Sequence, residues 1–364
     1  MKRRWGQLAY VAFICSLLLA FFGSAPSSAK ADDEAAKEGM LTIRGVDGTD
    51  RKAVEVTVLW TGNATDLSQM ALRENGAERK VDDLVDFRET GRGMGTVVVM
   101  DLSGSMNDDG ALSRAKAAVS EMAQNIPEGD LMAVVSFSND PEVETAFTSN
   151  TDQIQAALEG MAAPRDGRTA MYDGIRKAVT LFETRPALQP NILLVTDGSD
   201  DVSGASLEEA RASVVSAGAA FFAVELTHMD GEVDSGAIRS IIDRTGGATY
   251  SGTTEAEISK AFTDASTTMR SQYVATYASQ VEQGAIDLKI SVGGQEDKAS
   301  FVAGSKAEGA STAEVIATKK AFGPEWLRSS PIFPVLFVGL AIGLGIYAAI
   351  NLAGSRNENL SSVL

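Results

Sequence analysis

The chain has 364 residues, which leaves room for two or three domains. Its 49 acidic residues outnumber its 32 basic residues and give a formal net charge of −17 at pH 7. A surface of this charge repels nucleic acid and anionic lipid head groups, so we expect no nucleic-acid partner.

The first 31 residues have the pattern of a secretory signal peptide. Basic residues near the start precede the apolar stretch Leu8–Phe22, and small residues follow up to Ala31. Cleavage after Ala31, or nearby after Ala29, removes the only cysteine, Cys15, so we expect an exported protein without a disulfide. Cleavage also leaves 28 basic against 49 acidic residues, a net charge of −21. We expect residues 32–39 to be disordered.

Residues 40–93 have the composition of small β structure. Val54–Trp60 is apolar and rich in β-branched residues, and Asp82–Arg88 alternates between apolar and polar residues. Between them, Asn75-Gly76 is a typical hairpin turn. We therefore expect several short strands before the middle of the chain.

Residues 94–270 alternate between strand and helix patterns, which predicts an α/β fold with a doubly wound, mostly parallel, Rossmann-like sheet and helices on both faces. The expected strands are Thr96–Met100, Leu131–Ser138, a short edge strand at Val143–Phe147, Asn191–Thr196, Ala219–Leu226 and Thr249–Ser251. The expected helices are Ala111–Gln124, Thr151–Met161, Ala170–Glu183, Ser206–Ala217, Ser235–Arg244 and Glu255–Arg270.

Strand patterns return in residues 271–304. Because neither β region alone has enough strands to bury a face, we predict that residues 40–93 and 271–304 form one small β-sandwich into which residues 94–270 are inserted. The alternative is two separate β elements that pack on the larger domain. The expected strands of the second region are Tyr273–Ala278, Ala285–Val292 and Lys298–Val302.

The C-terminal part of the sequence predicts a membrane anchor. Pro331–Gly354 contains no charged residue, and its 24 residues span roughly 36 Å as a helix, enough to cross a bilayer. Residues 305–330 then form a polar linker. With the signal peptide setting the orientation, we expect a single-pass cell-membrane protein with an outer ectodomain and a cytoplasmic tail at residues 355–364. Gly339 and Gly343 form a GxxxG pair that favours helix–helix self-association.

Oxygen-bearing side chains follow two strands of the predicted α/β sheet. The apolar run Thr96–Met100 ends at Asp101, and Ser103 and Ser105 follow at alternate positions. Asp197 comes directly after Asn191–Thr196. Both carboxylates should therefore lie at the carboxyl edge of the sheet, where ligands bind in such folds.

Three further features concern the same edge. Thr169 lies near the start of an expected helix, where its hydroxyl either caps the helix or faces the edge. Two carboxylates with three hydroxyls form a hard-oxygen ligand set, which suits Mg²⁺, with Mn²⁺ and Ca²⁺ as alternatives. Further acids flank the edge and form a secondary acidic rim, namely Asp108, Asp109, Asp200 and Asp201.

The order Asp101-x-Ser103-x-Ser105, then Thr169, then Asp197 resembles the metal-ion-dependent adhesion site of von Willebrand factor type A domains. The resemblance covers about Thr96–Met269. It implies that these five residues bind one divalent cation, and that the cation captures an Asp or Glu carboxylate of another protein.

The leading functional hypothesis is a cell-surface, metal-dependent protein-binding module and not an enzyme. No histidine lies near a Ser or Cys nucleophile, and a metal-dependent hydrolase, the weaker alternative, would need Asp200 or Asp201 as its general base. The order of segments is similar to that of bacterial envelope proteins, including those joined to a membrane domain of the Tad pilus or type II secretion F family. Only Ser355–Leu364 follows the predicted helix here, so adhesion and a scaffold role in a pilus or secretion apparatus both stay open.

Overall fold

The computed structural model describes residues 39–227 and 235–308. The expected signal peptide, the anchor at Pro331–Gly354 with its Gly339 and Gly343, the tail, and most of the linker lie outside these residues. Within the described ranges, no helix combines the length and apolar character needed to cross a membrane.

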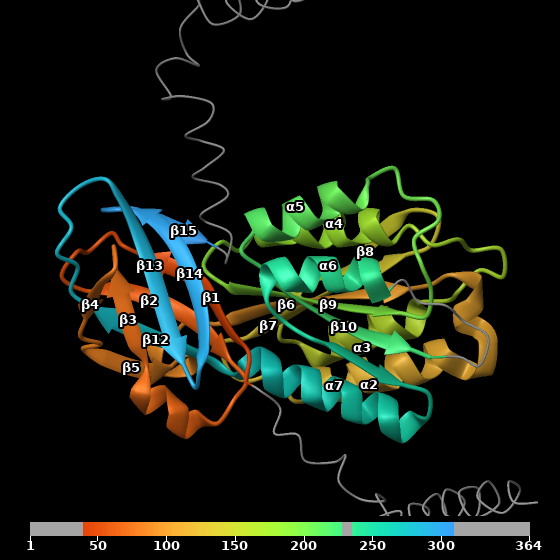
Figure 1. The fold of residues 1–364 in the computed structure, drawn as a ribbon. Coiled ribbons are helices and arrows are strands. Elements are labelled where there is room, and N and C mark those ends of the chain that lie inside the picture. The colour runs from red at the N-terminus through yellow and green to blue at the C-terminus, as the bar shows by residue number, and fades with distance from the viewer. Residues whose placement is uncertain (1–38, 228–234, 309–364) are drawn as a thin grey trace, which may run out of the picture. The chain divides into compact units, whose positions relative to one another are not determined.

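A six-stranded sheet forms the centre of the α/β part, in the order β11-β10-β9-β6-β7-β8. All neighbouring strands are parallel except β8, which runs antiparallel to β7 (Figure 1). This arrangement confirms the predicted α/β class with a mostly parallel sheet. The strands are β6 (Met94–Asp101), β7 (Leu131–Phe137), β8 (Pro141–Thr148), β9 (Gln189–Thr196), β10 (Ala220–Leu226) and β11 (Thr249–Gly252).

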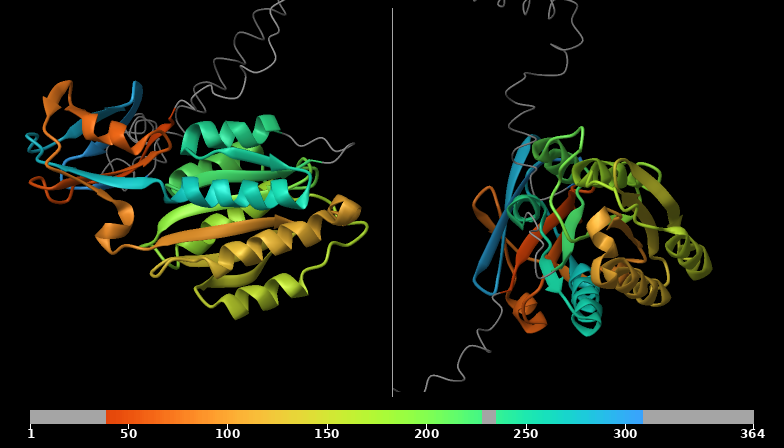
Figure 2. Two further views of the ribbon diagram at one scale, coloured as in Figure 1. Left: turned by 90° about the horizontal axis from the view of Figure 1, so that it is seen from below. Right: turned by 90° about the vertical axis from the view of Figure 1, so that its right-hand side faces the viewer.

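Six helices cover both faces of this sheet, and each begins and ends within one residue of its expected range (Figures 1 and 2). Alternate residues of β6 explain why both faces are covered. Val98 and Met100 pack with α2, α3 and α7, whereas Val97 and Val99 pack with α4, α5 and α6. The helices are α2 (Ala111–Gln124), α3 (Thr151–Gly160), α4 (Met171–Phe182), α5 (Leu207–Ser216), α6 (Ser235–Thr245) and α7 (Glu255–Arg270).

Two antiparallel sheets are built from strands on both sides of the α/β segment. One has the order β15-β1-β2-β12-β5 and the other the order β14-β13-β3-β4, so β12 lies between β2 and β5, and β13 lies beside β3 (Figure 1). Both sheets contribute to one apolar core. The strands are β1 (Leu41–Asp47), β2 (Val54–Trp60), β3 (Ala71–Glu74), β4 (Ala77–Arg79), β5 (Asp83–Asp86), β12 (Gln272–Tyr277), β13 (Ala285–Val292), β14 (Gln295–Val302) and β15 (Lys306–Glu308).

Two details differ from the sequence-based expectation. The linker was expected to begin at residue 305, but Lys306–Glu308 form β15 and pair with β1, because a short polar segment gains backbone hydrogen bonds at an open sheet edge. Three 3₁₀ helices were also not expected, namely η1 (Ala64–Gln69), η2 (Phe87–Thr90) and η3 (Gly104–Gly110).

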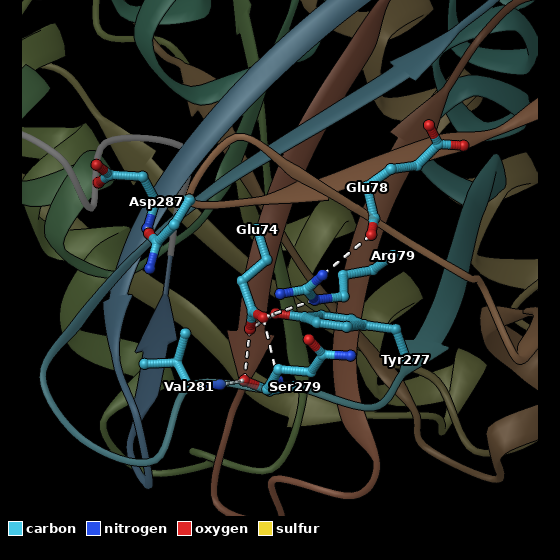
Figure 3. A network of polar contacts seen from close by, with 9 residues as sticks. Glu74, Glu78, Arg79, Tyr277, Ser279, Val281 and Asp287 are labelled. Carbon is cyan, nitrogen blue, oxygen red and sulfur yellow. Dashed lines mark hydrogen bonds and ion pairs between the residues drawn. The ribbon is translucent and has the colours of Figure 1, made fainter.

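A buried carboxylate joins the β3–β4 hairpin to the segment after β12 (Figure 3). Glu74 is 0% exposed. Burial opposes its ionisation, yet hydrogen bonds from Ser279, Arg79 and Gln280 outweigh this effect and lower the pKa of Glu74. Its oxygens accept hydrogen bonds from the Arg79 Nε at 2.9 Å, the Gln280 backbone N–H at 3.1 Å, the Tyr277 hydroxyl at 3.3 Å and the Ser279 hydroxyl.

Replacement of this carboxylate should cost stability in a pH-dependent way. We expect Glu74→Gln to lower the free energy of unfolding at pH 7 by about 1–3 kcal/mol, since buried donors lose a charged acceptor. Because the folded pKa lies below the unfolded value of about 4.3, the ionised side chain stabilises the fold above that pH, and this contribution is lost as the pH falls through the folded pKa. Urea denaturation across this pH range measures it.

The matched control is Glu78→Gln, because this side chain is exposed on β4 and only its carbonyl oxygen contacts Arg79 (Figure 3). A destabilisation by Glu74→Gln that stays constant from neutral to acidic pH would contradict the assignment.

Candidate metal site

The site lies where two buried parallel strands end beside each other. Asp101 is the last residue of β6, and Asp197 directly follows β9. These strands are neighbours in register, with Met100 opposite Val195. The strands therefore bring their two carboxylates to the same point of the carboxyl edge, as the sequence predicts for a parallel sheet.

Hydrogen bonds connect four of the five expected ligands. The Ser103 backbone N–H donates to Asp101 Oδ1 at 2.7 Å, and the Ser103 and Ser105 hydroxyl oxygens lie 3.1 Å apart. Ser105 then donates its hydroxyl to Asp197 Oδ1 at 2.9 Å. Asp101, Ser103 and Asp197 are buried, whereas Ser105 is exposed. The arrangement gives a compact group of oxygen atoms with one exposed member.

Thr169 lies on a second loop that is held against the first. The Gly104 backbone N–H donates to the Gly167 carbonyl at 2.9 Å. A Cβ atom on Gly104 would lie 2.6 Å from the Arg165 carbonyl oxygen, so this close approach requires glycine. Thr169 is buried, and the N-cap position of α4 is taken by the next residue, Ala170.

The acids expected to form a secondary rim have two different environments. Asp201 accepts the Thr169 backbone N–H at 2.8 Å and forms an ion pair with Arg168 at 3.1 Å. Asp200 accepts the Tyr172 backbone N–H at 3.1 Å. These two carboxylates therefore hold the second loop and the start of α4 against a third loop, the one that follows β9, while Asp108 and Asp109 are exposed in η3.

A supporting residue that the sequence analysis did not single out is Thr196. Its hydroxyl donates to Asp101 Oδ2 at 2.6 Å, and the residue is 0% exposed. The Gly198 backbone N–H donates in turn to the Thr196 hydroxyl at 3.2 Å. The available signal was a single hydroxyl at the end of the otherwise apolar run Ile192–Val195. Both oxygens of Asp101 are thus oriented by the protein itself.

The third loop also depends on a carboxylate that the sequence analysis passed over. Asp173, in the first turn of α4, accepts the backbone N–H groups of Gly204 at 2.7 Å and Ala205 at 3.1 Å. Because this carboxylate satisfies two loop donors, it fixes the path of the chain after Asp200.

The electrostatics of Asp101 favour a cation. Burial, together with a smaller effect of the nearby Asp197 carboxylate, outweighs the hydrogen bonds from Thr196 and Ser103 and raises the pKa of Asp101 to about 7. In the described part of the chain, no cationic side chain pairs with Asp101. A buried carboxylate without a counter-charge is costly, so a bound cation fits these residues.

The ligand chemistry is that of a hard cation. Within residues 39–227 and 235–308, no three His, Cys, Asp or Glu side chains gather as a metal group. The oxygen atoms at this edge come instead from two carboxylates and the neighbouring hydroxyls, a set that suits Mg²⁺, Mn²⁺ or Ca²⁺ better than zinc or copper.

Comparison with known proteins finds a family match in the segment that carries this edge. Residues 96–199 match the von Willebrand factor type A domain family. No curated protein matches the chain. Similar solved structures include BatB from Bacteroides thetaiotaomicron, with 16% identity, a TM-score of 0.40, and coverage of 48% of this chain and 100% of that one.

Two further similar structures cover more of the chain. The von Willebrand factor type A protein from Catenulispora acidiphila has 13% identity and a TM-score of 0.46 over 77% of this chain and 75% of that one. Proximal thread matrix protein 1 from the mussel byssus, in a form with a zinc-occupied MIDAS motif, has 18% identity and a TM-score of 0.45 over 57% of this chain and 50% of that one.

Proposed function

We propose that the von Willebrand factor type A domain of this chain binds one divalent cation and uses it to capture a carboxylate of a partner protein. The observation that carries the proposal is the buried Asp101, which lacks a cationic partner in the described structure and is linked through Ser103 and Ser105 to Asp197. The proposed ligands are Asp101, Ser103, Ser105, Thr169 and Asp197, some of them through water.

Mg²⁺ is the expected cation, with Mn²⁺ and Ca²⁺ as alternatives. Two carboxylates balance its formal charge, and the hydroxyl oxygens of Ser103, Ser105 and Thr169 add no further negative charge. A cation held in this way keeps affinity for an additional anionic ligand. Mg²⁺ also retains waters in protein sites, and one such water is a place where an Asp or Glu of a partner can enter.

A binding role is favoured over hydrolysis. Domains of this family are typically non-catalytic binding modules. The hydrolase alternative needs Asp200 or Asp201 as a general base, but their carboxylates accept backbone N–H groups of Tyr172 and Thr169 and serve to brace the loops. They are thus poorly placed to take a proton from a metal-bound water.

The setting that we propose is the outer face of a cell membrane. It rests on the sequence patterns of a signal peptide and of an anchor at Pro331–Gly354. Self-association of the anchor through Gly339 and Gly343 would present several metal sites side by side. Adhesion is the first candidate role, and a scaffold role in a pilus or secretion apparatus is the second.

Cation binding should depend on Asp101. In calorimetry with the detergent-solubilised full chain, we expect one Mg²⁺ or Mn²⁺ per chain, and no binding to Asp101→Ala, which loses a charged ligand. Thr196→Val should weaken binding by about 10–100-fold, because this residue only orients the Asp101 carboxylate.

Asp108→Ala, an exposed acid in the same loop, is the matched control and should bind the cation normally. Far-ultraviolet circular dichroism checks that each variant is folded. An unchanged affinity of a folded Asp101→Ala chain for Mg²⁺ or Mn²⁺ would contradict the proposed metal site.

Partner recognition should require both the cation and a carboxylate. On an array of peptides that each carry one Asp or Glu, with Asn and Gln versions as matched controls, the full chain should bind acidic members in Mg²⁺ and not in EDTA. Thr169→Ala should weaken this binding. Because the acidic chain repels anions at long range, higher salt should leave the affinity of a bound peptide nearly unchanged or raise it.

If peptides bind equally well in EDTA and to the Asp101→Ala chain, recognition lies elsewhere, with the antiparallel sheets as the next surface to test. The cation would then have a structural role only.

A further inference from the structure

A cavity of about 700 Å³ lies at the amino-terminal edge of β9, the opposite end of this strand from Asp197. One part of its wall comes from β1, β2 and η2, and another from the C-terminal ends of α4 and α5. Apolar side chains line much of it, including Phe87, Val179, Phe182 and Leu188. The volume is in the range of small-molecule binding sites in proteins.

Arg44 is part of the cavity wall and lies at an irregularity in β1. Ile43 pairs with Val58 and Gly45 pairs with Thr57, so Arg44 is the extra residue of a β-bulge. Bulges turn a side chain away from the regular alternation of a strand. Here Arg44 is 2% exposed, and its Nη2 donates to the carbonyl oxygens of Pro190 at 2.8 Å and Gly218 at 2.9 Å.

The rest of the Arg44 guanidinium lacks partners. Its Nε and Nη1 atoms are buried and make no hydrogen bond, and no acidic side chain of the described residues pairs with it. Burial alone lowers the pKa of Arg44 to about 9. Buried charges of this kind are normally paired, because leaving one unpaired is costly.

The acids on the cavity wall do not supply the missing counter-charge. Asp47 pairs with Lys306 at 2.6 Å, and Glu55 pairs with Arg92 at 3.2 Å. Glu183 is exposed and forms no ion pair with Arg44. The wall thus combines apolar surface with a cationic group that has unused donors.

We propose that this cavity binds an amphipathic organic carboxylate, with its head group at Arg44 and its apolar body against Phe87, Phe182 and Leu188. The unused guanidinium donors match a carboxylate, and charge-assisted hydrogen bonds of this kind are among the stronger ones in proteins. Neither nitrogen has exposed surface in this structure, so the proposed binding requires a side chain of the wall to move.

Benzoate is a suitable probe, and benzamide is its neutral isostere. In calorimetry with the full chain in EDTA, which keeps the metal site empty, we expect one benzoate to bind per chain. The affinity for benzamide should be lower than that for benzoate by about tenfold or more. Arg44→Met should weaken benzoate binding by about tenfold or more, while Arg73→Met, the same change at an exposed position of β3, should leave it unchanged.

A second variant covers the case in which Arg44→Met does not fold. Ala187 is an exposed residue of the cavity wall, and Ala187→Trp should block benzoate while leaving Arg44 in place. The proposal is overturned if benzoate does not bind at millimolar concentration, if benzamide binds equally well, or if a folded Arg44→Met or Ala187→Trp chain keeps the full affinity. None of these results bears on the metal site.

Discussion

The carboxyl edge of the α/β sheet is organised around the buried carboxylate of Asp101. It sits at the end of a strand covered on both faces, where water does not stabilise its charge, and it meets a second carboxylate, Asp197, from the neighbouring strand. Thr196 and the backbone of Ser103 orient both Asp101 oxygens but add no positive charge. The proposed divalent cation would resolve this conflict, because it would supply the counter-charge at the point to which the protein already directs its oxygen atoms.

The two proposed sites lie at opposite edges of the parallel sheet and differ in charge. At the carboxyl edge, the loops carry acids and hydroxyls that suit a cation. At the amino edge, the carbonyl oxygens of Pro190 and Gly218 accept hydrogen bonds from Arg44. Gly218 follows α5, and the C-terminal end of a helix favours positive charge. The two proposals thus place a cation at one edge of this sheet and an anion at the other.

Much of the α/β part could be predicted because its signals are local. The run Thr96–Met100 has no polar alternation, which already indicates a strand buried on both faces, and the position of Asp101 after it fixes the edge at which the carboxylate lies. The spacing of Ser103 and Ser105 needs no tertiary information either.

The remaining features depend on contacts between distant segments. Nothing local in the acids Asp200 and Asp201 shows that they accept the backbone N–H groups of Tyr172 and Thr169, about thirty residues earlier. The bulge that turns Arg44 inward depends on its pairing with β2, and β15 forms only because β1 leaves an open edge. Such features follow from how the chain packs, so sequence patterns alone do not specify them.

Anomalous diffraction from crystals soaked in Mn²⁺ tests the central claim most directly. We expect one peak at the carboxyl ends of β6 and β9, about 2.0–2.6 Å from coordinating oxygens of Ser103 and Ser105 and within direct or one-water reach of Asp101 and Asp197. No peak at this edge under saturating Mn²⁺, or a peak only at exposed acids such as Asp108, would contradict it.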